Sequence, residues 1–227
     1  MKYKNIQKGL FLSKINRFTA KILINDVEET CHIKNTGRCK ELFIPGVGVY
    51  VEKAENPDRK TKFDLISVYK NNTLINVDSQ APNKVVKEYL EKGLFIKNIS
   101  LIKPEYTYKK SRFDFYVEAG KRKIFIEVKG VTLENNGVVK FPDAPTIRGL
   151  KHLNELCECI EDGYEAFVIF VIQMENVDYF TPNSDTDPEF TKALKKAISL
   201  GVNVNCFSCT VMENELKIKE SVPFKTE

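Results

Sequence analysis

The chain has 227 residues, 42% of them hydrophobic and 29% charged, which allows one large core or two smaller domains, since domains commonly contain about 100 to 200 residues. The formal net charge of +4 excludes a strongly basic chain, so any basic surface must be local. No run approaches the roughly 18 apolar residues of a membrane helix, and no signal core follows Met1, so we expect a cytoplasmic protein without a membrane partner.

The cysteines are expected to be free thiols, since a reduced cytosolic chain rarely forms disulfides. Cys206 and Cys209 have the spacing of half a zinc site, but they lie in an extended run, where residues three apart point to opposite faces. Structural thiols are therefore favoured over a zinc ligand pair.

The first third of the chain is rich in short β-like runs. Turn-forming residues such as Asn25-Asp26 and Asn71-Asn72 separate these runs. They cover residues 18–24, 47–51, 63–69 and 73–77. This rhythm predicts a small all-β barrel or meander.

The pattern changes after Pro82, where Val85, Val86, Tyr89 and Leu90 recur at helical spacing until Gly93. A domain boundary near residue 80 is therefore predicted, which gives domains 1–80 and 81–227. Extended runs at 102–108, 112–118 and 123–131 follow.

A second helix is predicted from an apolar stripe that runs from Ile147 to Ile160, and Gly163 ends it. Residues 166–172 are apolar at every position, as expected for a central strand covered on both faces. A helix at 188–200 and a strand at 202–212 complete an α/β (α+β) domain with a mixed sheet. The tail from Glu220 is expected to be loosely held.

The candidate chemistry lies in a hairpin of residues 112–129. Gly120-Lys121 suits a two-residue type II′ turn, which places Phe113, Phe115 and Val117 together on one apolar core face. On the opposite face the turn places Asp114 directly across from Glu127, with facing Cβ atoms about 4.5 to 5.5 Å apart.

Two facing carboxylates repel each other, so a divalent cation between them would be stabilising. Lys129 points to the same face as Glu127, because strand side chains alternate. Hard oxygen ligands favour Mg²⁺ or Mn²⁺. Two carboxylates, a divalent ion and a lysine together suit phosphodiester hydrolysis. The alternative is the ordinary solvated face of a hairpin, and a one-residue shift in register would separate the two acids.

Asp114 followed by Glu127-Val-Lys129 resembles the PD-(D/E)XK nuclease motif. The whole chain resembles the sugar fermentation stimulation protein family, SfsA, through motifs that occur in the family's order. These are Asn35-Thr-Gly37, Asn56-Pro57, Pro82-Asn83, Ser111-Arg-Phe-Asp114, Glu127-Val-Lys129, Phe141-Pro-Asp143 and Arg148-Gly-Leu-Lys-His152. The resemblance implies an N-terminal OB-like β-barrel, a PD-(D/E)XK nuclease-like domain, and DNA binding linked to the regulation of sugar metabolism.

The resemblance also implies roles for single residues. Asp114, Glu127 and Glu88 would be metal ligands, and Lys129 would be the catalytic lysine. The alternative for Glu88 is a solvated helix residue beside Lys84.

The resemblance also places Arg148 and Lys151, on the helix near residue 150, at the mouth of the site, where they could clamp a phosphate. Both could equally be basic residues on an exposed helical face. His152 would be either a phosphate contact or a surface imidazole.

OB-like barrels bind single strands with exposed aromatic and basic residues. Arg17, Phe18, Arg38 and Lys40 are therefore candidates for nucleic-acid binding, although each could be structural or solvated.

Two functions follow from the sequence. The first is a nuclease, a hydrolase that binds nucleic acid and depends on Mg²⁺ or Mn²⁺. Its expected partner is DNA. The second is a non-catalytic DNA-binding transcriptional regulator of sugar metabolism that keeps the nuclease fold for phosphate recognition. A sugar- or nucleotide-sensing module has no motif to support it.

Overall fold

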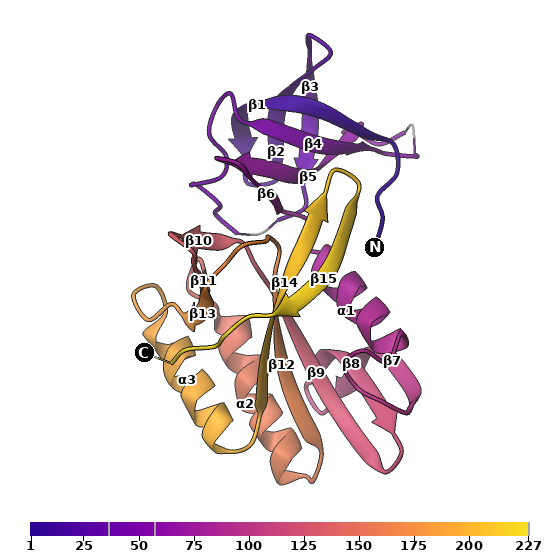
Figure 1. Cartoon of the computed structure of the whole chain (residues 1–227), viewed down its shortest axis with the longest axis vertical. Helices are drawn as coiled ribbons and strands as arrows, with labels where there is room; N and C mark the ends of the chain where they lie inside the picture. Colours follow the sequence, from indigo (N-terminus) through magenta and orange to yellow (C-terminus); the bar gives the residue numbers. More distant parts are fainter. Residues whose placement is uncertain (36, 57, 227) are drawn as a thin grey trace.

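The computed structural model describes residues 1–35, 37–56 and 58–226. Thr36 and Pro57, which belong to two of the family-like motifs, lie outside the described residues. The chain forms a β-barrel stacked on one end of a larger α/β part (Figure 1). No helix in the described part of the chain is both long enough and apolar enough to cross a membrane.

The barrel is built by the first strands of the chain. Antiparallel pairs join β1 to β2, β2 to β3, β1 to β4 and β4 to β5, and a parallel pair between β3 and β5 closes the ring. The bounds are β1 (Ile6–Asn16), β2 (Thr19–Ile24), β3 (Val27–Ile33), β4 (Gly48–Lys53), β5 (Phe63–Lys70) and β6 (Thr73–Asn76), with β6 added beside β5. The predicted barrel is confirmed.

The larger part is a mixed sheet with helices on both faces. Its strand order is β15-β14-β12-β9-β8-β7, and β12 runs parallel to both neighbours. The strands are β7 (Ile99–Tyr108), β8 (Ser111–Ala119), β9 (Arg122–Val131), β12 (Glu165–Ile172), β14 (Asn203–Met212) and β15 (Glu215–Ser221). A small second sheet contains β10 (Leu133–Asn135), β11 (Val138–Phe141) and β13 (Tyr179–Pro182).

Alternate residues of β12 belong to two different cores. Val168 and Phe170 pack with residues of α2 (Ile147–Glu161) and α3 (Pro188–Ser199). Ile169 and Val171 pack with residues of α1 (Ala81–Glu91) on the other face. The uninterrupted apolar run therefore has the predicted cause, a central strand covered on both faces.

The cysteines behave as predicted from the strand period. All six are buried and free. Cys206 belongs to the core on the α2 and α3 face, whereas Cys209 belongs to the core on the α1 face. The two thiols of the Cys-X-X-Cys sequence are thus separated by the sheet.

The prediction of a loosely held C-terminal tail is wrong. β15 pairs with β14 as far as Ser221, the Lys225 amide donates to the Phe180 carbonyl at 2.9 Å, and the Phe224 ring stacks on Phe180 with centroids 5.9 Å apart. Two apolar residues near the end, Val222 and Phe224, dock on the core and hold the tail.

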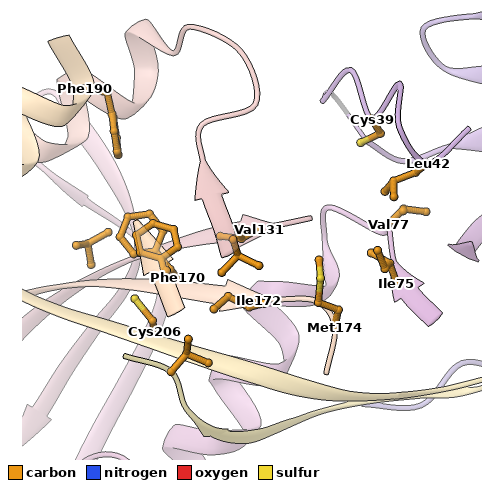
Figure 2. Close-up of a cluster of buried hydrophobic side chains, with 14 of the residues drawn as sticks. Cys39, Leu42, Ile75, Val77, Val131, Phe170, Ile172, Met174, Phe190 and Cys206 are labelled. Atoms are coloured by element: carbon orange, nitrogen blue, oxygen red, sulfur yellow. The ribbon is translucent and has the colours of Figure 1, made fainter. Parts of the chain in front are cut away.

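The barrel and the larger part share one buried core. Leu42 and Val77 of the barrel belong to the same hydrophobic cluster as Val131, Ile172 and Met174 of the larger part (Figure 2). The boundary near residue 80 stays a prediction, because apolar burial is continuous across it.

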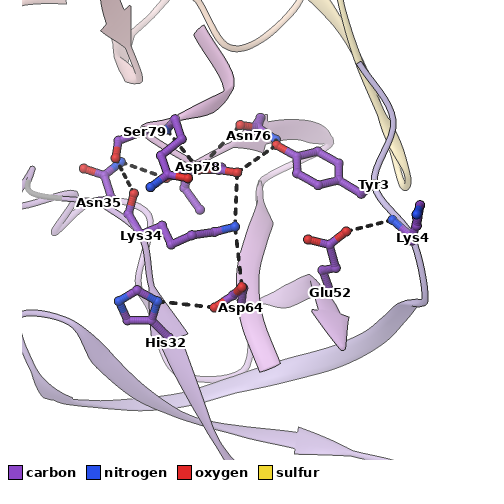
Figure 3. Close-up of polar contacts among 12 residues, drawn as sticks. Tyr3, Lys4, His32, Lys34, Asn35, Glu52, Asp64, Asn76, Asp78 and Ser79 are labelled. Carbon is purple, nitrogen blue, oxygen red and sulfur yellow. Dashed lines mark hydrogen bonds and ion pairs between the residues drawn. The ribbon is translucent and has the colours of Figure 1, made fainter. Parts of the chain in front are cut away.

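A buried polar network lies beside this shared core (Figure 3). The Lys34 ammonium is 3.4 Å from Asp78 Oδ2 and 3.5 Å from Asp64 Oδ2, so one cation serves two buried carboxylates. The Gln173 amide, just beyond β12, donates to Asn76 Oδ1 at 2.8 Å and to the Asp78 carbonyl at 3.1 Å. These bonds tie the barrel to the carboxyl end of the central strand.

Candidate active site

The hairpin of β8 and β9 has the predicted register. Phe115 pairs with Ile126, Val117 with Ile124 and Ala119 with Arg122, and Gly120 in the turn has φ +62. Within the described residues the ladder stops at Phe115, so the predicted pair of Asp114 with Glu127 does not form. The Val128 amide beyond it donates instead to Asp114 Oδ2, at 2.7 Å. The Asp114 side chain thus takes the place of a backbone acceptor.

The prediction that Phe113 shares a face with Phe115 is wrong. The Phe113 ring packs on Phe125, with centroids 5.3 Å apart, on the α2 face, whereas Phe115 belongs to the core on the α1 face. The alternation breaks at Asp114, which has no paired residue on β7, where Glu105 has φ +51. This local irregularity turns the Asp114 carboxylate toward Val128 and β9.

Glu127 is the buried centre of the site, with 3% of its surface exposed. Its Oε1 atom accepts from the Lys129 ammonium at 2.7 Å and contacts His152 Nδ1 of α2. Its Oε2 atom is buried and has no hydrogen-bond partner among the described residues. One oxygen is held in place, and the other is left free.

Asp114 lies close enough to Glu127 for the two charges to interact. Its Oδ1 atom accepts from the Asn83 amide of α1 at 2.6 Å. Burial raises the pKa of Asp114, and the Glu127 charge raises it further, against the lowering effect of Val128 and Asn83. Burial also raises the pKa of Glu127, but Lys129 and His152 outweigh it and hold this pKa below its usual range. A second negative charge beside Glu127 is therefore costly, and Lys129 offsets only part of this cost.

A cleft of about 400 Å³ opens over these carboxylates between the two parts of the chain. Asp114, Glu127 and Lys129 line it together with two more cations, Lys140 and Arg148. The barrel contributes Asn35, Gly37 and Ser79. The Arg38 amide donates to Asp143 Oδ2 at 2.8 Å, so the barrel loop is attached directly to the cleft wall.

Glu88 does not reach the cleft. Its carboxylate accepts from the Met1 amino group at 2.9 Å and lies in a hollow with Lys92 and Lys217. The first turn of α1 faces the cleft, and the helix rises about 1.5 Å per residue, so Glu88 lies about 7.5 Å along the axis from Asn83. The residue of α1 that meets the carboxylates is therefore Asn83.

The candidates on α2 occupy different environments. Arg148 is exposed at the edge of the cleft, and Lys151 is exposed next to it, with its ammonium 3.2 Å from the Lys110 carbonyl. His152 is not a surface imidazole, because it is only 5% exposed and its ring contacts Glu127. It faces the sheet, whereas its neighbour Lys151 faces solvent.

The barrel candidates lie outside the residues that line the cleft. Arg17 lies over the Phe18 ring, 5.5 Å from its centroid, and Phe18 is 45% exposed at the β1–β2 turn. The side chains of Arg38 and Lys40 are also exposed. These residues offer a separate surface on the barrel.

Sequence reasoning gave no role to Asn83, Asp143, Lys140 or Gln173, which all line the cleft. The signal was present for two of them, because Pro82-Asn83 and Phe141-Pro-Asp143 are among the family-like motifs. Their meeting with β9 depends on how α1 and β11 pack, which strand and helix periods do not specify.

Comparisons with known proteins agree with this architecture. The family model for the SfsA N-terminal OB domain matches residues 12–77, and the model for the sugar fermentation stimulation protein RE domain matches residues 80–215. A sugar fermentation stimulation protein homolog from Ruminiclostridium cellulolyticum is 58% identical over 222 residues, or 98% of each chain. One from Clostridium beijerinckii has the same identity and coverage.

The structure of Pyrococcus furiosus SfsA, in complex with Ca²⁺, superposes with a TM-score of 0.91 at 28% identity and covers 99% of this chain and 98% of that chain. The predicted architecture is thereby confirmed, an OB-like barrel followed by a mixed-sheet α/β domain. From its two matched domains and its relatives over nearly the full length, this chain belongs to the sugar fermentation stimulation protein family, SfsA.

Proposed function

We propose that this protein is a divalent-metal-dependent phosphodiester hydrolase that acts on nucleic acid, with DNA as its first candidate substrate. The observation that carries the proposal is the buried, unpartnered Oε2 atom of Glu127 beside a second carboxylate, Asp114. A buried oxygen without a donor is costly, so it favours a cation as its missing partner.

The residues present fit Mg²⁺ or Mn²⁺. Among the described residues, no group of three or more His, Cys, Asp or Glu side chains is placed to hold a metal ion, so the protein would supply only two ligands. Mg²⁺ commonly binds through only one or two carboxylates and takes its other oxygens from water and substrate phosphate. Asp114 and Glu127 would be these two ligands. The family member from Pyrococcus furiosus that was solved with Ca²⁺ supports a site for a hard divalent ion.

When bound, such an ion supplies Lewis-acid polarisation of the phosphate. The protein's own contribution is preorganised charge. Lys129, whose side chain is 12% exposed, holds an ammonium at the cleft, where it stabilises negative charge that develops on the phosphate. His152 fixes Glu127 through Oε1 and so leaves Oε2 as its free oxygen.

Arg148 would bind the substrate. Its guanidinium is exposed at the edge of the cleft, and a guanidinium binds phosphate through paired hydrogen bonds. If Arg148 holds one phosphate of the strand at that edge, the next phosphodiester of the strand would lie beside Asp114 and Glu127.

A specific observation favours the second function, a non-catalytic DNA-binding regulator. Lys129 and His152 already contact Glu127, so the charge of this carboxylate is balanced without a metal. In that case the cleft would recognise phosphate through its cations and would carry out no hydrolysis.

The test is cleavage of labelled single- and double-stranded DNA and RNA with Mg²⁺ or Mn²⁺, and with EDTA as the blank. We expect Asp114→Asn and Lys129→Met each to reduce cleavage about 100-fold or more, the usual effect of losing a preorganised charge. Glu88→Gln is the matched control, because this carboxylate lies outside the cleft. Absence of cleavage with intact DNA binding would favour the regulator.

Metal binding is measured separately by calorimetric titration with Mn²⁺. We expect one site in the wild type and in Glu88→Gln, and loss of that site in Asp114→Asn. Unchanged Mn²⁺ binding by Asp114→Asn would show that the ligand assignment is wrong, whatever the cleavage assay gives.

A further inference from the structure

A second depression adjoins the cleft where the β7–β8 turn meets the start of α2. It is an open groove of about 580 Å³, and we call it the basic groove. Its side chains include Lys110, Arg112, Ile147, Arg148, Lys151 and His152.

The basic groove is continuous with the cleft. Arg148 lines both of them. His152 lines the groove, and its ring contacts Glu127, which lines the cleft. A chain of phosphates that lies along the groove would therefore lead to the carboxylates.

The cations of the groove are available to an anionic ligand. Among the described residues, Lys110 and Arg148 have no acidic partner. Arg112 lies 3.5 Å from Glu105, and both side chains are more than 60% exposed. Lys151 lies 3.7 Å from Glu155. The exposed Arg112–Glu105 pair is weak, so phosphate can replace its acidic member. Lys151 is 52% exposed, although the Glu155 side chain beside it is only 12% exposed.

Ile147 gives the groove a feature that phosphate binding does not explain. It is 88% exposed, more than any other exposed large hydrophobic residue of the described chain. It is the first residue of α2 and is followed directly by Arg148. A single exposed apolar residue is ordinary on a protein surface, but this one stands within a cluster of cations that suits nucleic acid.

We propose that the basic groove binds a nucleic-acid strand by its phosphates and that Ile147 packs on the face of an unpaired base. In a continuous duplex the base faces are covered by stacking, and only base edges and backbone are accessible. Aliphatic and aromatic side chains reach base faces where the strand is single or locally unstacked. The inference rests on the proposed function and assigns its substrate, a strand with an unpaired base beside the cleft.

The test is binding of a labelled single-stranded DNA oligonucleotide and of its duplex, measured by fluorescence anisotropy in EDTA so that no cleavage occurs. We expect Ile147→Ala to weaken single-strand binding about 10-fold, as for loss of part of a buried isoleucine, with little change for the duplex. Ile147→Phe, which offers a larger flat face, should keep or improve single-strand binding.

Leu94→Ala is the matched control, because Leu94 is 53% exposed and lies in the hollow beside Glu88, outside the groove. It should bind both substrates as the wild type does. Lys110→Ala tests the phosphate contacts, and it should reduce the slope of log affinity against log salt by about 0.7 for the single strand.

An equal loss on both substrates, or no loss on either, would overturn the role of Ile147. The proposed hydrolase fails by a different result, namely no metal-dependent cleavage while Ile147→Ala still weakens single-strand binding. Cleavage by the wild type with unchanged single-strand binding by Ile147→Ala would refute only the inference about the groove.

Discussion

At the scale of single residues, Glu127 shows how the site combines local and distant contributions. Lys129 reaches it through the strand period of two, and this could be predicted from the sequence. His152 reaches it from α2, 25 residues later in the chain, so its contact depends on how the helix docks on the sheet. The same buried histidine was indistinguishable from a surface residue in the sequence.

Asp64 in the barrel gives a prediction at this scale. Its carboxylate accepts from the Arg59 guanidinium at 2.6 and 3.0 Å. Burial raises the pKa of Asp64, but Arg59 and Lys34 outweigh it and leave the pKa lowered from 3.8. Ionised Asp64 therefore stabilises the folded protein fully above about pH 4, the ordinary pKa of an aspartate. This stabilisation is lost as the pH falls through the lowered pKa that Asp64 has in the folded protein.

We expect Arg59→Gln to reduce the free energy of unfolding by about 1 kcal/mol at pH 7, since the pair is bidentate but partly exposed. The difference from the wild type should shrink as the pH falls below 4, because Asp64 becomes protonated. Urea unfolding across this pH range measures it, with Lys60→Gln as the control of equal charge change. A difference that is constant with pH would contradict the assignment.

At the scale of elements, α1 and the end of β12 approach β9 closely at Gly130, next to the site residue Lys129. Gly130 follows Lys129, and a Cβ atom there would lie 2.6 Å from Gln173 Oε1 and 2.9 Å from Pro82 Cγ of α1. A side chain at this position would push α1 or the end of β12 away from the strand. The close approach of three elements thus requires glycine.

We expect Gly130→Ala to reduce the free energy of unfolding by about 1 to 3 kcal/mol, the usual cost of overpacking. Gly48→Ala in β4 is the matched control, because the nearest atom to its Cβ would be a Tyr69 ring carbon at 3.2 Å. Urea unfolding followed by circular dichroism compares the two. If Gly130→Ala lost no more free energy of unfolding than Gly48→Ala, the approach of α1 and Gln173 to Gly130 would not be tight.

At the scale of the whole molecule, the barrel and the larger part depend on each other. They share one hydrophobic cluster, and the cleft takes residues from both (Figure 2). Gln173 joins them through Asn76 and Asp78 and also lines the cleft. A rigid connection at this point would keep the barrel loop at a fixed distance from the carboxylates.

We expect the protein to unfold in one cooperative transition. Gln173→Ala should lower the midpoint of that transition and reduce the free energy of unfolding by about 1 to 3 kcal/mol, because two buried acceptors lose their donor. Gln80→Ala is the control, since Gln80 is exposed and its side chain makes no capping bond. Two separate transitions in the wild type would refute the coupling.

The sequence by itself determined the features that depend on periods and turns. The alternating barrel strands, the helix after Pro82, the buried run at 166–172 and the hairpin register from Phe115 to Ala119 follow from local patterns. The sequence also placed Asp114, Glu127 and Lys129 on one hairpin, although the ladder set by the two-residue turn stops at Phe115, short of the predicted Asp114–Glu127 pair.

Only the tertiary structure decided how separate elements meet. The side of β8 on which Phe113 lies, the separation of Glu88 from the cleft and the contacts of Asn83 and His152 with the carboxylates all depend on docking. The physical reason is that a strand or helix period specifies which side chains share a face. It does not specify which other element covers that face, because the fit of whole buried surfaces decides this.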